Sequence, residues 1–138
     1  LRGCIGTTVA HQPLGDDVAR HAYAAAFQDP RFGPVQRSEW AALSLEISVL
    51  APPSDLAVHG RGELLRRLRP GVDGLVLRAG NRGATFLPSV WASLSEPARF
   101  VDALLAKGGF DRGSWPEGMR VQTYTVEKWR SEPPKFGA

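Results

Sequence analysis

The sequence predicts an α+β fold in which helices pack on a mixed, largely antiparallel sheet. Strand-like and helix-like segments do not alternate strictly along the chain, and two long amphipathic stretches have helical periodicity. A glycine-rich turn at residues 80–83 joins two short apolar segments as a tight hairpin would. A regular Rossmann arrangement is therefore not expected.

The first third of the chain is expected to form a strand, a helix and a second strand. Residues 1–7 alternate as a strand with one apolar face. Residues 13–29 are predicted to form a helix that Asp16 caps and that Pro30 ends. A proline-stiffened loop and a short helical turn follow, and residues 44–50 then alternate cleanly as a strand.

The rest of the chain is expected to form two helices and three strands. Residues 62–68 are predicted to form a short amphipathic helix, and residues 75–78 and 84–87 to form the two arms of the hairpin. Residues 95–107 are predicted to form the second long helix, which ends at a pair of glycines. Residues 119–128 alternate as a final strand.

Composition narrows the classes of protein that the chain can represent. The 138 residues are 43% hydrophobic, enough for one compact domain, and they include no long apolar run or signal-peptide pattern. Neither membrane insertion nor export is expected, and the single cysteine, Cys4, agrees with a reducing, cytoplasmic location. The net charge is only +3 and no aromatic residues accompany the basic cluster at 66–69, so nucleic-acid binding is not expected.

Five segments stand out in order along the chain: LRGCIGT at 1–7, DPRF at 29–32, LEISVL at 45–50, DGLVLRAGNRGATFLPSVW at 73–91 and the KGGF that closes the second long helix. Together they resemble the AMMECR-type domain family, which includes protein A of the AmmeMemoRadiSam system. The most specific of them is the opening LRGCIG, and the others gain weight from their order and spacing along the chain. Ser89 departs from the family, whose members often have glutamine there.

The resemblance carries expectations about fold and partners. It implies a single AMMECR-type domain over residues 1–138, with a larger subdomain from both chain ends and a smaller one from the middle. Members normally carry a further N-terminal segment, so we expect the domain to be incomplete at that end. The family is associated with Memo-like and radical SAM proteins, which implies a shared pathway with those partners but no established reaction.

The candidate catalytic residues centre on Cys4. If residues 1–7 form a strand, Arg2 and Cys4 lie on the same face, and a nearby guanidinium favours the reactive thiolate. Gly3 and Gly6 would let a substrate or another stretch of backbone approach closely. The alternative is that Cys4 is a small buried side chain and that the glycines only permit tight packing.

Further polar residues are candidates for substrate binding or proton transfer. Glu46 and Ser48 share the polar face of their predicted strand, so Glu46 is a candidate acid or base, or else a surface residue paired with Arg2. Asp29 and Arg31, on the stiff loop, would bind a carboxylate or phosphate, or else pair with each other.

No metal or cofactor is expected. The three histidines lack the spacing of a metal motif and are expected at the surface, and the four tryptophans are expected to pack in the core or between subdomains.

Two functions follow as hypotheses. The first is an enzyme or enzyme component that uses the Cys4 thiolate on a small molecule. The second is a non-catalytic adaptor that docks a partner protein through the LRGCIG face.

Overall fold

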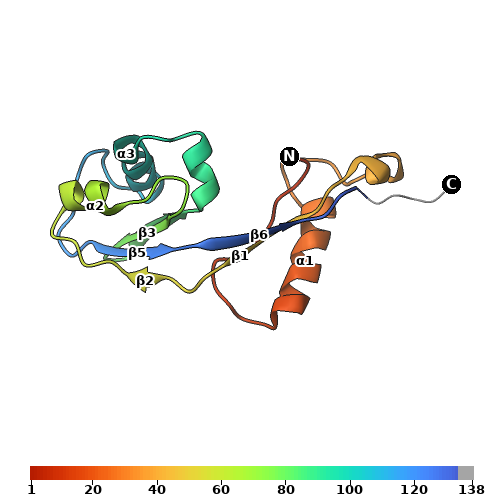
Figure 1. Ribbon diagram of the computed structural model, residues 1–138, viewed down its shortest axis with the longest axis horizontal. Coiled ribbons are helices and arrows are strands. Elements are labelled where there is room, and N and C mark those ends of the chain that lie inside the picture. The colour runs from red at the N-terminus through yellow and green to blue at the C-terminus, as the bar shows by residue number, and fades with distance from the viewer. Residues whose placement is uncertain (134–138) are drawn as a thin grey trace. The chain divides into compact units, whose positions relative to one another are not determined.

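The computed structural model describes residues 1–133, and its chain forms two compact units (Figure 1). One unit contains residues 1–48 together with the described residues from Lys128 onward. The other is built from residues Val49–Glu127. Helices and largely antiparallel strands occur together, which confirms the predicted α+β class.

The middle unit is built on a four-stranded sheet with the order β2-β5-β3-β4. Each recorded pairing between these strands is antiparallel. Gly80, with a φ of 60°, and Asn81 form the two-residue turn between β3 and β4, as the glycine-rich sequence predicted. The four strands are β2 (Ser54–Asp55), β3 (Gly74–Ala79), β4 (Arg82–Phe86) and β5 (Arg120–Tyr124).

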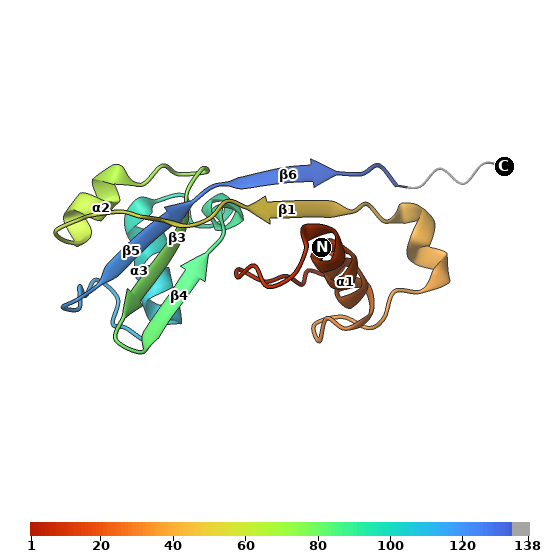
Figure 2. The same ribbon diagram turned by 90° about the horizontal axis from the view of Figure 1, so that it is seen from below.

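Helices α2 (Arg61–Arg67) and α3 (Pro97–Lys107) cover one face of this sheet (Figures 1 and 2). Trp91, which belongs to the short 3-10 helix Pro88–Ala92, is buried in the core. Its ring stacks on Phe100 of α3, with the two ring centroids 3.7 Å apart. The indole nitrogen of Trp91 donates a hydrogen bond to the carbonyl oxygen of Asp73 at 2.7 Å. The remaining fully buried core side chains come from both helices and the central strand: Leu64, Leu75, Leu77, Val101, Leu104 and Leu105.

The unit that contains the chain ends is built around helix α1 (Leu14–Phe27), followed by a 3-10 helix at Arg37–Ala42. Strands β1 (Glu46–Leu50) and β6 (Val126–Arg130) form a separate two-stranded sheet, and the chain passes from one unit to the other within each of them. No residue of α1 is buried. Asp16 lies in the first turn and is not the cap, because the helix begins directly after Pro13.

One of the predicted strands is wrong, and another is divided in two. Residues 1–7 have no regular secondary structure, because main-chain groups of Cys4 bond to side chains of the 29–31 loop and not to a neighbouring strand. The single strand predicted over residues 119–128 is divided at Thr125 into β5 and β6, which pair in different sheets. An alternating pattern fixes the period of a strand but not its partner.

The tryptophans also depart in part from expectation. Trp91 is buried, but Trp40 and Trp129 are about half exposed, at 49% and 53%. In the part of the chain that the structure describes, no helix has both the length and the apolar character needed to span a membrane.

Candidate functional site

The LRGCIG segment runs alongside α1 in an extended but irregular conformation (Figure 2). Gly3 touches the main chain of α1, where an added Cβ would come within 2.8 Å of the Ala25 carbonyl carbon and closer still to its oxygen. Gly6 has open space at the same position. Of the two close approaches proposed for these glycines, Gly3 therefore serves the approach of another backbone, and the side of Gly6 is free.

Cys4 is exposed, and its main chain is fixed from both sides by the pair Asp29 and Arg31. The Cys4 N–H donates to Asp29 Oδ2 at 2.9 Å, and Arg31 Nη2 donates to the Cys4 carbonyl oxygen at 3.2 Å. The alternative of a buried cysteine is therefore wrong. The sulfur belongs to an exposed residue whose backbone is tied down at two points.

The carboxylate of Asp29 is the centre of this arrangement. Its side chain is 1% exposed and accepts hydrogen bonds from Arg31 N at 3.0 Å, Arg31 Nε at 3.0 Å and Arg31 Nη2 at 2.7 Å, in addition to the bond from Cys4. The bonds from the Arg31 side chain, followed by the one from the Cys4 amide, hold the pKa of Asp29 well below its ordinary value. Asp29 and Arg31 thus form the mutual pair that was one of the two alternatives, while the Arg31 side chain remains 55% exposed.

Arg2 does not pair with Glu46, as one alternative had it, but with Glu39. Its Nε donates to Glu39 Oε1 at 2.6 Å, its Nη2 donates to Oε2 at 3.0 Å, and its Nη1 donates to the Gly33 carbonyl oxygen at 2.9 Å. The alternation that would place Arg2 beside Cys4 requires a regular strand, and this segment is not one. The pKa of Glu39 is lowered from 4.5 to about 2, and the largest cause of this shift is the hydrogen bond from Arg2.

The guanidinium groups of Arg2 and Arg31 both lie near the ring of Phe32, at 5.9 Å and 5.4 Å from its centroid. Arg31 is also the arginine that interacts with the cysteine. The pKa of Arg31 is raised chiefly by its hydrogen bond to Asp29. Arg31, and not Arg2, is therefore the arginine that contacts Cys4, through its bond to the Cys4 carbonyl oxygen.

Glu46 and Ser48 are exposed on β1, as their strand pattern predicted. Glu46 lies 3.6 Å from the ammonium group of Lys128 on β6. Among residues 1–133, no hydrogen bond or ion pair joins either side chain to Cys4 or Arg2. The structure therefore gathers Cys4, Asp29 and Arg31 and does not bring Glu46 and Ser48 to them by direct contact.

Sequence reasoning missed a second polar cluster at the start of α1. Asp17 Oδ2 lies 3.1 Å from His21 Nδ1, and Gln12 Nε2 donates to Asp17 Oδ1 at 2.8 Å. The bond from Gln12 and the interactions with His21 lower the pKa of Asp17. The four-residue spacing of Asp17 and His21 is the signal that would have revealed the pair. The side chain of His21 is half-buried, whereas the histidines were expected at the surface.

None of the described side chains forms a cluster of three or more histidine, cysteine, aspartate or glutamate residues that could hold a metal ion.

Comparison with known proteins shows which family the chain matches. The family model AMMECR1 matches residues 1–129. A protein of Sulfurisphaera tokodaii is 33% identical over 98% of this chain and 60% of its own length, and a protein of Aquifex aeolicus is 32% identical over 99% of this chain and 70% of its own.

The fold agrees with a solved structure. The crystal structure of the uncharacterised protein PH0010 from Pyrococcus horikoshii matches with a TM-score of 0.82 and 32% identity, over 97% of this chain and 66% of that one. The chain thus spans about two thirds of the length of the relatives that it matches from end to end. These matches show that the chain belongs to the AMMECR1 family.

Proposed function

We propose that the chain is an enzyme, or a component of one, in which the Cys4 thiolate attacks a small electrophilic molecule. The observation that carries the proposal is the exposed Cys4 side chain on a backbone fixed at both its N–H and its carbonyl. A nucleophile is most effective when rigid neighbours determine its position, and its sulfur must also be accessible.

Arg31 supplies the electrostatic part of the proposal. Its guanidinium donates to the Cys4 carbonyl oxygen at 3.2 Å, so a positive charge lies close to the cysteine, and reactive cysteines are commonly found beside cationic groups. The open space at Gly6 leaves room beside the segment for a substrate. The proposal assigns no proton transfer to Glu46, whose partner is Lys128.

We also propose that this reaction belongs to a pathway shared with other proteins. The resemblance to protein A of the AmmeMemoRadiSam system supports a role alongside Memo-like and radical SAM proteins, with a small molecule that those proteins produce or consume as the substrate.

The test measures how fast iodoacetamide alkylates Cys4, the only cysteine in the chain, at neutral pH. We expect the folded chain to react several times faster than the urea-unfolded chain. Arg31→Gln should slow the reaction, and Arg31→Lys, which keeps the charge, should restore part of the rate. Arg37→Gln removes the same charge from an exposed position and should leave the rate unchanged. A folded chain that reacts no faster than the unfolded one would refute thiolate catalysis.

A docking function is the second candidate, because the same stretch of chain exposes large apolar side chains. Leu1 is 88% exposed and Val9 64% exposed, on either side of Cys4. Apolar side chains that a protein exposes can mark the surface where a partner docks. In calorimetric titrations with a purified Memo-like protein, binding that Val9→Asp abolishes and Cys4→Ser leaves intact would favour the adaptor. Binding that neither change affects would exclude docking through this segment.

A further inference from the structure

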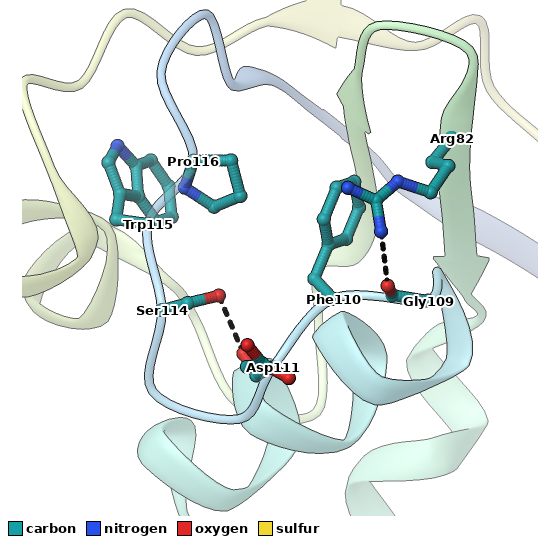
Figure 3. A pocket seen from close by; sticks show the side chains of 7 residues that line it. All are labelled: Arg82, Gly109, Phe110, Asp111, Ser114, Trp115 and Pro116. Carbon is teal, nitrogen blue, oxygen red and sulfur yellow. Dashed lines mark hydrogen bonds between the residues drawn. The ribbon is translucent and has the colours of Figure 1, made fainter.

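The middle unit contains a hollow whose lining residues are distant in the sequence from Cys4, Asp29 and Arg31. Its volume is about 290 Å³, and it opens between the start of β4 and the loop that follows α3 (Figure 3). That volume is at the lower end of the range of small-molecule pockets, about 300–1,000 Å³. Its lining consists of Arg82, Gly109, Phe110, Asp111, Ser114, Trp115 and Pro116.

The loop that walls the hollow is held in place by its own hydrogen bonds. Gly109, with a φ of 82°, turns the chain at the end of α3, and the N–H of Phe110 returns to the carbonyl of Leu105 at 2.9 Å. Further along, the N–H of Gly113 donates to the carboxylate of Asp102 at 3.0 Å. The hollow is therefore a built feature of the fold and not a gap beneath an untethered loop.

Arg82 gives the hollow its chemistry. Its guanidinium carbon lies 4.6 Å from the centroid of the Phe110 ring, and its Nη1 donates to the Gly109 carbonyl at 2.6 Å. Within residues 1–133 the Arg82 side chain takes part in no ion pair, and the bond to Gly109 is its single hydrogen bond. An arginine has five N–H donors, so most of this fork remains available to a planar oxyanion.

The other walls limit the kind of ligand that fits. The rings of Trp115 and Pro116 give an apolar surface, and Figure 3 shows them across the hollow from the guanidinium. The Ser114 hydroxyl donates to the Asp111 carbonyl at 2.6 Å, so its remaining capacity is to accept. The carboxylate of Asp111 forms no ion pair with another described residue. Its negative charge repels ligands that carry several negative charges.

We propose that this hollow binds a small carboxylate with one negative charge and a planar apolar body. The carboxylate takes the free edge of the Arg82 guanidinium, and the apolar body lies against Trp115 and Pro116. The size of the hollow corresponds to a ligand no larger than an aromatic amino acid.

The experiment follows the indole N–H signals of the four tryptophans by NMR while phenylacetate is added. We expect the Trp115 signal, identified by its absence in Trp115→Phe, to shift and saturate with a Kd of about 1 mM or tighter. The signal of buried Trp91 should stay in place and report that the unit is folded. Phenylacetamide, which has the same shape without the charge, should bind at least about tenfold more weakly.

Variants of the two hairpin arginines complete the test. Arg82→Gln should weaken phenylacetate binding about tenfold or more, and Arg82→Lys, which keeps the charge without the fork, should weaken it less. Arg78→Gln makes the same change on the other arm of the hairpin and should have no effect. The proposal is overturned if Trp115 does not respond, if phenylacetamide binds equally well, or if the Arg82 and Arg78 variants behave alike.

Discussion

Replacement of Gly3 by alanine should disrupt the contact between the LRGCIG segment and α1. An added Cβ would come within 2.8 Å of the Ala25 carbonyl carbon and still closer to its oxygen, and both atoms belong to a helix backbone that cannot move aside cheaply. The segment would have to shift away from α1. Such a shift would strain the bonds that Cys4 makes to Asp29 and Arg31.

Gly6→Ala is the matched control, because nothing lies within 4 Å of its added Cβ. Both substitutions restrict the unfolded chain to a similar extent, by about 0.4–1 kcal/mol, so this contribution cancels when the two are compared. Overpacking costs about 1–3 kcal/mol. Gly3→Ala should therefore be less stable than Gly6→Ala by about that amount.

Urea unfolding followed by circular dichroism gives the two free energies, and the alkylation rate of Cys4 reports on the segment itself. We expect the Gly3 variant to lose the rate advantage of the folded chain and the Gly6 variant to keep it. Equal stability and equal rates in the two variants would show that the segment does not rest on α1 as described.

Two further predictions concern stability. Trp91→Ala should lower the free energy of unfolding by about 3–5 kcal/mol in calorimetry, because a buried stacked ring is lost, while Trp129→Ala at an exposed position should stay within about 0.5 kcal/mol. Arg2 lowers the pKa of Glu39 from 4.5 to about 2, so the charged pair stabilises the fold above about pH 4.5 and this contribution is lost as the pH falls through 2. Glu39→Gln should therefore weaken the dependence of stability on pH in urea titrations across that interval, and an unchanged dependence would contradict the pairing.

Elements determined by local pattern were predictable from the sequence. Strand β1 and the β3–β4 hairpin follow from alternation and a glycine turn, and α3 follows from its four inward side chains and the glycines at its end. In each, the residues that specify the element are neighbours in the chain. Periodicity and turn chemistry therefore suffice to identify them.

Residues 1–7 show where this reasoning stops. Their alternation is genuine, but a strand needs a partner, and here the carboxylate of Asp29 and the guanidinium of Arg31 take the main-chain groups of Cys4 instead. The division between β5 and β6 was hidden for a similar reason, because pairing with β3 or with β1 depends on residues distant in the sequence.

The candidate site was predictable in its members more than in their partners. Cys4, Asp29 and Arg31 were all identified from residue type and from the stiffness of the loop. The sequence could not show that Arg31 and not Arg2 contacts Cys4, because Arg2 bonds to Glu39, which is 37 residues away in the sequence.

The grip of Asp29 and Arg31 on main-chain atoms has a practical consequence for chemical work on this family. Neither residue bonds to the Cys4 sulfur, so the sulfur can be exchanged for oxygen or selenium, or carry a probe, while both bonds to the Cys4 main chain are kept. Chemistry at that position can thus be varied while architecture stays constant.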